Sequence, residues 1–225
     1  KVMYGTKNFC KEPAMSRQQA AKAIWYGFEK VQELYEEGYR LIATGEMGIG
    51  NTTTSSAVTA VLLQKEVEQV TGRGAGLSQE GLLKKISAIQ KGIDLHHPDE
   101  RDVLDVLSKV GGLDIAGLTG VYLGCAFYRI PAIIDGFISG AAALCASKLN
   151  PDTLDYMIAS HCSKEAGSQM IIKKLGLDTM IQGDLSLGEG SGGVLLIPIL
   201  DMATTIFKQM ETFDGIAIEA YQPLN

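Results

Sequence analysis

The chain has 225 residues, of which 46% are hydrophobic and 20% charged, so it can bury a substantial core. Its 20 Lys and Arg residues against 26 Asp and Glu residues give a net charge of −6, which argues against a nucleic-acid or anionic-membrane surface. The apolar runs, such as residues 194–200, are much shorter than the roughly 20 residues that cross a bilayer. We therefore expect a soluble, cytoplasmic protein that binds neither nucleic acid nor membrane and holds any anionic ligand locally.

The four cysteines are widely spaced and form no CxxC pair, which is typical of reduced thiols. Cys162 stands beside His161, but a nucleophilic cysteine needs a base that the fold positions, so the structural interpretation is favoured. No group of residues has the spacing of metal ligands, and we expect a reaction without metal or cofactor. The sequence starts at Lys1 without a signal-peptide pattern, which we interpret as a cut into a longer protein.

The predicted elements alternate between helices and short apolar strands. A helix capped by Ser16 runs to about Glu37, and the apolar run 41–43 then leads through a glycine-rich turn into a second helix. Amphipathic helices follow over 77–93 and 99–110, and a more buried helix over 114–129. Two further units each place a strand before a helix, at 130–134 with 139–149 and at 156–159 with a helix ending at Gly176; a final helix covers about 193–210. This alternation predicts one α/β domain over residues 1–225, with a parallel sheet flanked by helices.

The segment GEMGIGNTT (residues 45–53) connects the first predicted strand to a helix. Its glycines, among them Gly48 and Gly50, let the backbone approach a ligand, and the helix start directs free N–H groups there. Asn51-Thr52 replaces the Lys-Ser/Thr of a Walker loop. The segment is typical of a phosphate or carboxylate site, with a plain strand-to-helix turn as the alternative. Glu46 would repel a phosphate, so its predicted role is sugar binding.

Three further positions are candidates for ligand contact. GRGAG (residues 72–76), which contains Gly74, precedes a helix carrying Lys84 and Lys85, and either lysine could bring positive charge to a phosphate or simply face solvent. Asp135 and Gly136 follow the second strand, at the edge where open α/β sheets bind ligands; Asp135 either holds a ribose or caps its helix. His161, in the polar SHCS turn after the third strand, is either a ligand contact or a structural hydrogen-bonding residue.

The segment GEGSGG (residues 188–193) places Glu189 between glycines just before an apolar helix. The flanking glycines provide no side chains for packing, which favours a functional role for the carboxylate. A glutamate at a helix start also interacts favourably with the helix dipole. From the residues alone, Glu189 is therefore equally well interpreted as a catalytic group or as a helix cap.

Taken together and in order, GEMGIGNTT, GRGAGL, GGLDIAGLTG, DGFISGAAAL, IASHCSKEAG and LGEGSGG resemble the nicotinate-nucleotide:dimethylbenzimidazole phosphoribosyltransferases of cobalamin lower-ligand assembly. The resemblance covers nearly the whole chain. It implies a Rossmann-like fold in a homodimer, and transfer of ribosyl 5-phosphate from nicotinate mononucleotide to 5,6-dimethylbenzimidazole or a related aromatic base. The products are nicotinate and α-ribazole 5′-phosphate. In this family the catalytic glutamate matches Glu189.

The resemblance also implies the substrate-contacting positions. The nucleotide phosphate and ribose are expected at Glu46, Gly48, Gly50, Asn51, Gly74, Lys85, Asp135, Gly136 and Ser163, and the acceptor base near Leu187 and Gly188. Family chains carry an N-terminal region ahead of the counterpart of Lys1 that supplies part of the acceptor pocket. A smaller helical part, to which residues 1–38 and 194–225 contribute, is therefore expected to be incomplete. The alternative is a non-catalytic nucleotide-binding subunit that partners a longer paralogue.

Overall fold

The computed structural model describes residues 1–213, 215–219 and 222. Its sheet has four parallel strands in the order β1 (Ile42–Ala43), β2 (Ala132–Ile134), β3 (Met157–His161) and β4 (Thr179–Ile181). The register places Ala43 beside Ile133, and Ile134 beside Ala159. Because all four strands run in the same direction, their carboxyl ends lie along one edge of the sheet.

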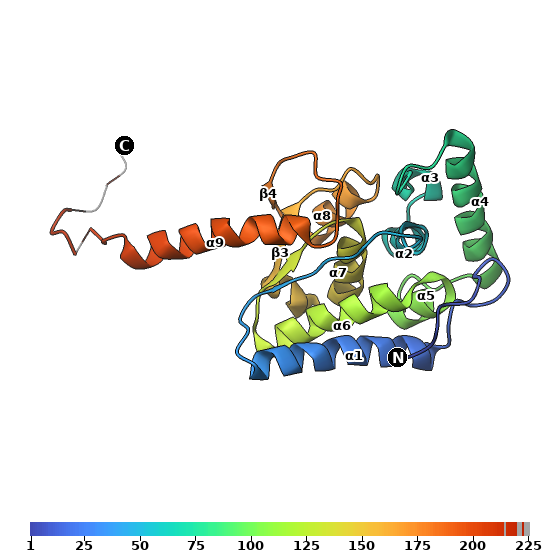
Figure 1. The fold of residues 1–225 in the computed structure, drawn as a ribbon, viewed down its shortest axis with the longest axis horizontal. Helices are drawn as coiled ribbons and strands as arrows, with labels where there is room; N and C mark the ends of the chain where they lie inside the picture. Colours follow the sequence, from blue (N-terminus) through green and yellow to red (C-terminus); the bar gives the residue numbers. More distant parts are fainter. Residues whose placement is uncertain (214, 220–221, 223–225) are drawn as a thin grey trace.

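Helices flank the sheet (Figure 1), which confirms the predicted α/β class. In the described part of the chain they are α1 (Arg17–Glu36), α2 (Thr52–Leu63), α3 (Val67–Val70), α4 (Gln79–His96), α5 (Val103–Val110), α6 (Leu113–Tyr128), α7 (Phe137–Leu149), α8 (Ser168–Leu175) and α9 (Ser191–Gln209), with a 3-10 helix η1 (Pro151–Tyr156). The helix α7, which is almost entirely buried, packs against β2, α6 and α8. The core of the molecule therefore lies between the sheet and these helices.

Most predicted elements are confirmed with small shifts of their ends. The side chain of Ser16 accepts a hydrogen bond from the Gln19 backbone N–H, and the Gln19 side chain accepts one from the Ser16 N–H, which makes a capping box at the start of α1. The helix α7 begins at Phe137 rather than at residue 139. The strand β4 was not predicted, because Thr179–Ile181 is a partly exposed three-residue edge strand without a distinctive apolar pattern.

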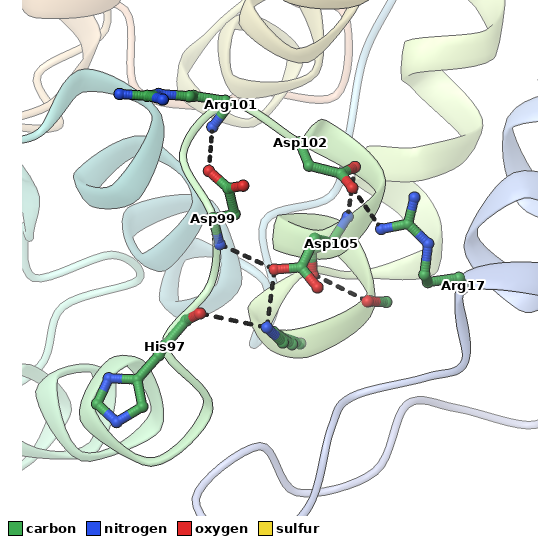
Figure 2. Close-up of polar contacts among 8 residues, drawn as sticks. Arg17, His97, Asp99, Arg101, Asp102 and Asp105 are labelled. Carbon is green, nitrogen blue, oxygen red and sulfur yellow. Dashed lines mark hydrogen bonds and ion pairs between the residues drawn. The ribbon is translucent and has the colours of Figure 1, made fainter.

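A polar network joins α1 to α5 and to the loop before α5 (Figure 2). The Arg17 guanidinium donates to the Asp102 carboxylate at 2.7 Å, and this carboxylate also accepts the Asp105 N–H as the cap of α5. The Asp105 carboxylate accepts the Asp99 N–H at 2.8 Å. The Arg17 hydrogen bond lowers the pKa of Asp102. The network fixes the start of α5, away from the loops at the sheet edge.

The helix α9 extends away from the rest of the molecule (Figure 1). Its first turns contact β3 and β4, whereas several of its later apolar side chains, including Met202, Ile206 and Phe207, are exposed. Within the described residues, α9 is a helix whose length and composition would suffice to cross a membrane, with 17% of its apolar window buried. The sequence alone indicated only a short apolar run here, because Asp201 ends the run 194–200, although α9 continues through both Pro198 and Asp201. This apolar exposure distinguishes α9 from α7.

Candidate active site

The loops that follow β1, β2 and β3 meet at the carboxyl edge of the sheet, as the sequence predicts. An open pocket of about 480 Å³ lies at this edge, within the size range of roughly 300–1,000 Å³ that is usual for small-molecule sites. Its walls come from the segments 46–52, 72–75, 135–139, 161–165 and 185–188. Three of the glycine-rich segments singled out from the sequence, together with the DGF and SHCS turns, therefore form a single site.

The GEMGIGNTT and GEGSGG loops touch through their backbones. A Cβ atom at Gly45 would clash with the backbone nitrogen of Gly190 and lie 2.6 Å from its Cα. The Glu189 N–H donates to the Glu46 carbonyl at 2.9 Å. Gly188, Glu189 and Gly190 all have positive φ, at 73°, 58° and 83°. A left-handed glutamate is uncommon and is maintained by surrounding contacts, so this loop has the strained backbone that is frequent at functional sites.

Asp135, directly after β2, accepts hydrogen bonds from the backbone of the GEGSGG loop. Its side chain is 2% exposed. One carboxylate oxygen accepts the Gly190 N–H at 3.1 Å, and the other accepts the Gly192 N–H at 2.8 Å. The helix α7 has no side-chain cap. Asp135 thus caps a helix, as one sequence interpretation allowed, but that helix is α9 and not the one that follows it.

His161 ends β3 beneath the same loop. It is 4% exposed, and its Nδ1 lies 3.0 Å from the Ser160 hydroxyl. Burial lowers the pKa of His161, and the nearby Asp135 opposes this shift. A Cβ atom at Gly192 would clash with the His161 ring and would lie 2.8 Å from a carboxylate oxygen of Asp135. Only glycine therefore fits at position 192 without displacing these two side chains.

Lys85 is buried behind the wall of the pocket. Its ammonium group donates to the Thr52 hydroxyl and to the Gly72 carbonyl, both at 2.9 Å, and lies 3.7 Å from the position of a Cβ atom at Gly74. Desolvation lowers the pKa of Lys85, while the charge of Glu165 opposes this effect. Lys84, in contrast, is exposed and pairs with Glu80 at 2.6 Å. Of the two lysines considered from the sequence, the structure places Lys85 at the pocket wall.

Glu46 and Asn51 belong to a polar cluster at the start of α2. The Glu46 carboxylate accepts the Gly48 N–H at 2.9 Å and an N–H of the Asn51 side chain. The same Asn51 amide nitrogen donates to Asp114 on α6 at 2.7 Å. Both bonds to Glu46 go to one carboxylate oxygen, so within the described residues the other oxygen has no partner. Asp114 was not singled out in the sequence, although it lies inside the GGLDIAGLTG segment.

The structure brings most of the candidate residues to the pocket surface. The lining includes Glu46, Gly48, Gly74, Asp135, Gly136, Ser163, Leu187 and Gly188. Gly50, Asn51, Lys85 and Glu189 are not in the lining: Asn51 and Lys85 bond to residues of the pocket wall, and Glu189 is exposed beside Gly188. Glu189 is therefore exposed next to the pocket lining and is not part of it.

Sequence reasoning missed several charged side chains of the pocket. Arg73, Lys164 and Glu165 all line it. The Arg73 guanidinium bonds to the Leu77 carbonyl at 2.8 Å, and Lys164 pairs with Asp184 at 3.4 Å. Their positions directly inside the GRGAG and SHCSKEAG turns were the available signal. Arg73 and Lys164 bring positive charge to the lining, alongside the carboxylates of Glu46, Asp135 and Glu165.

The cysteines are all free, and two of them are buried. Burial raises the pKa of Cys125 and of Cys145 to about 12. Cys162 is half-buried, and its sulfur lies 3.7 Å from the Ser168 hydroxyl. Within the described residues, no group of three or more His, Cys, Asp or Glu side chains could hold a metal ion.

Comparison with known proteins identifies the family. The phosphoribosyltransferase family matches residues 1–218. The nicotinate-nucleotide–dimethylbenzimidazole phosphoribosyltransferase of Acetivibrio thermocellus is 49% identical over 223 residues, which is 99% of this chain. The chain belongs to the phosphoribosyltransferase family whose model it matches. The relative from Clostridium acetobutylicum is also 49% identical, over 100% of the chain.

Solved structures of the family have the same fold. The crystal structure of CobT from Thermus thermophilus matches with a TM-score of 0.92 and 38% identity, over 98% of this chain and 66% of that chain. The present chain spans 64% of the length of the two bacterial relatives of this family. Similarity to the family therefore extends over the whole pocket described above.

Proposed function

We propose that this chain carries the nucleotide site and the catalytic glutamate of a nicotinate-nucleotide:dimethylbenzimidazole phosphoribosyltransferase. The enzyme transfers ribosyl 5-phosphate from nicotinate mononucleotide to 5,6-dimethylbenzimidazole or a related aromatic base, and releases nicotinate and α-ribazole 5′-phosphate. The observation that carries this proposal is the 49% identity, over the whole chain, with proteins of that name. The arrangement of the pocket supports it independently.

The phosphate of the nucleotide binds at the end of the pocket formed by Gly48, Gly74 and Lys85. Glycine backbone allows close approach there, and the start of α2 provides free N–H groups. Lys85 already uses two hydrogen bonds at 2.9 Å, to Thr52 and Gly72, which hold its ammonium group in place. Burial lowers the pKa of Lys85. The negative charge of a bound phosphate raises this pKa again and so stabilises the protonated ammonium group.

The ribose lies between Glu46 and the turn at Gly136 and Ser163. The free carboxylate oxygen of Glu46 accepts a ribose hydroxyl, while its other oxygen is fixed by Gly48 and Asn51. Gly136 and Ser163 are neighbours in the pocket lining, with the position of a Cβ at Gly136 3.9 Å from that of Ser163. Gly50 shapes the turn through its positive φ of 81°. These contacts orient C1′ toward the 185–189 loop.

Glu189 acts as the general base. Nicotinate leaves as its positive ring nitrogen becomes neutral and C1′ gains oxocarbenium character, while one nitrogen of the acceptor ring attacks. Glu189 takes the proton from the other ring nitrogen, a role typically worth about a hundred- to ten-thousand-fold in rate. Leu187 is 69% exposed and, with Gly188, provides an apolar surface next to this carboxylate for the acceptor ring.

The wider setting is part of the same proposal. The enzyme works in the cytoplasm, needs no metal or cofactor, and forms a homodimer or pairs with a longer paralogue. Residues 1–38 and 194–225 contribute to a helical subdomain; residues 214, 220–221 and 223–225 of the second segment lie outside the described residues. In the structure, α1 packs along α6, and α9 extends outward.

The direct test is to incubate the protein, expressed at its full natural length, with nicotinate mononucleotide and 5,6-dimethylbenzimidazole. Chromatography should detect nicotinate and α-ribazole 5′-phosphate in equal amounts, and only when both substrates are present. Binding of nicotinate mononucleotide without turnover would instead indicate a non-catalytic subunit, especially if a longer paralogue restored activity. Nicotinate release without the aromatic base would contradict the transfer reaction.

A further inference from the structure

We infer that Asp135 is the positioning residue that holds the Glu189 loop in place, and that it links this loop to the nucleotide side of the pocket. The inference rests on the proposed function, because it concerns the presentation of the proposed base. Asp135 belongs to the turn after β2, whereas Glu189 belongs to the loop before α9, 54 residues later in the chain. The bonds between them cross from one loop of the site to the other.

The carboxylate of Asp135 is almost fully used by this loop. One oxygen accepts the Gly190 N–H at 3.1 Å, and the other accepts the N–H groups of Gly192 at 2.8 Å and Gly193 at 3.4 Å. The first residues of α9 have no side-chain cap of their own. Asp135 therefore supplies the hydrogen-bond acceptor and the negative charge that a helix start favours.

The backbone next to these bonds is the strained part of the loop. Glu189 has a φ of 58°, between two glycines that are also left-handed. Non-glycine residues adopt this conformation at a cost and keep it only when neighbouring contacts hold them there. On the N-terminal side the contact is the Glu189 N–H bond to the Glu46 carbonyl, and on the C-terminal side it is the Asp135 carboxylate. Removal of the second contact leaves the C-terminal side of Glu189 held by the Ser191 N–H bond to the Gly188 carbonyl at 3.0 Å.

Buried neighbours keep Asp135 in this role. His161 lies beneath Gly192, and burial lowers its pKa, which favours the neutral ring over a cation that would compete for the carboxylate. Gly136, the next residue in the chain, lines the pocket where the nucleotide is proposed to bind. Asp135 therefore supports the Glu189 loop from a turn whose next residue lines the pocket.

The test replaces Asp135 by Asn, which has the same shape but one acceptor fewer. Asn can still accept from Gly192, but its NH₂ group then faces the Gly190 N–H, which loses its bond. We expect kcat to fall about a hundredfold, as for a displaced catalytic group, while the Kd for nicotinate mononucleotide stays within about threefold. The matched control is Asp102→Asn, which makes the same chemical change at the cap of α5, away from the pocket.

A second pair of variants covers the case in which Asp135→Asn does not fold. Gly192→Ala attacks the same contact from the other side, because the new Cβ would clash with His161 and approach Asp135 at 2.8 Å. Gly183→Ala is its control, since a Cβ there meets only Leu185, at 4.0 Å. Gly192→Ala should lower kcat with little change in nucleotide affinity, and Gly183→Ala should leave both unchanged.

Amide hydrogen exchange separates this inference from the proposed function, because it needs no turnover. The Gly190 N–H should exchange faster in Asp135→Asn than in the wild type, and should be unaffected in Asp102→Asn. Unchanged kcat in the Asp135 and Gly192 variants of an active enzyme, or an equal loss in Asp102→Asn, would overturn the inference. A wild type without turnover would refute the proposed function instead, and the exchange comparison would still decide whether Asp135 holds the loop.

Discussion

Replacing Lys85 by Met tests the phosphate end of the pocket. The ammonium group of Lys85 is held by Thr52 and Gly72 at 2.9 Å, which leaves one of its three N–H bonds for the ligand. A hydrogen bond to a charged group contributes about 1.5–3 kcal/mol. At about 1.4 kcal/mol per tenfold change in equilibrium constant, loss of this bond weakens binding of nicotinate mononucleotide roughly ten- to a hundredfold. Methionine retains much of the side-chain volume, so the wall of the pocket stays filled.

The assay compares two ligands by calorimetry. Nicotinate mononucleotide carries the phosphate, and nicotinate riboside is the same molecule without it. Lys85→Met should weaken binding of the first and leave the second nearly unchanged. The neighbouring variant Lys84→Met is the control, because Lys84 is exposed and pairs with Glu80. A thermal unfolding scan shows whether the Thr52 hydroxyl and Gly72 carbonyl, left without their partner, destabilise the fold.

If Lys85→Met weakened the binding of nicotinate mononucleotide and of nicotinate riboside equally, the assignment of Lys85 to the phosphate would be refuted. A loss in the Lys84 variant as large as that in the Lys85 variant would also refute it, since the exposed ion pair of Lys84 is expected to matter little.

Three further predictions concern contacts of the fold. Asp102→Ala removes the cap of α5 and the ion pair with Arg17. The free energy of unfolding, measured in urea, should therefore fall by about 1–2 kcal/mol. An unchanged urea midpoint would contradict this prediction. In Gly45→Ala the new Cβ would clash with the Gly190 backbone. This variant should have lower activity and a free energy of unfolding that is about 1–3 kcal/mol lower. Wild-type activity and stability would contradict the close contact between the two loops. Burial lowers the pKa of His161, so stability should fall as the pH drops below the ordinary imidazole value of about 6.5. The melting temperature of His161→Gln should therefore decline less between about pH 6.5 and 5, and parallel curves would exclude this contribution.

The sequence was sufficient to locate the loops of the site. Short apolar runs before GEMGIGNTT and DGF predicted β1 and β2, and the carboxyl ends of parallel strands necessarily meet at one edge. Glycines at positions such as 48 and 190 have positive φ, which is the conformation that makes glycine necessary there. These features depend on local sequence and on the rules of parallel sheets, so they could be predicted.

The partners of individual side chains could not be predicted in the same way. The acceptor of the Gly190 N–H is Asp135, 55 residues earlier, and nothing in the local pattern indicates that pairing. The choice between Lys84 and Lys85 depended on which face of α4 meets Gly72, a matter of tertiary packing. The strand β4 was missed because a short, partly exposed edge strand has little apolar signal. Long-range packing determined the first two of these outcomes.

The role of Glu189 is the central claim, and the most direct measurement is the rate of nicotinate release by wild type and by Glu189→Gln at saturating nicotinate mononucleotide and 5,6-dimethylbenzimidazole. Glutamine keeps the shape of the side chain but cannot take the proton. We predict a rate about a hundred- to ten-thousand-fold lower, with the Kd for nicotinate mononucleotide unchanged because Glu189 is not among the residues that line the pocket. A Glu189→Gln enzyme that releases nicotinate at the wild-type rate would contradict the account.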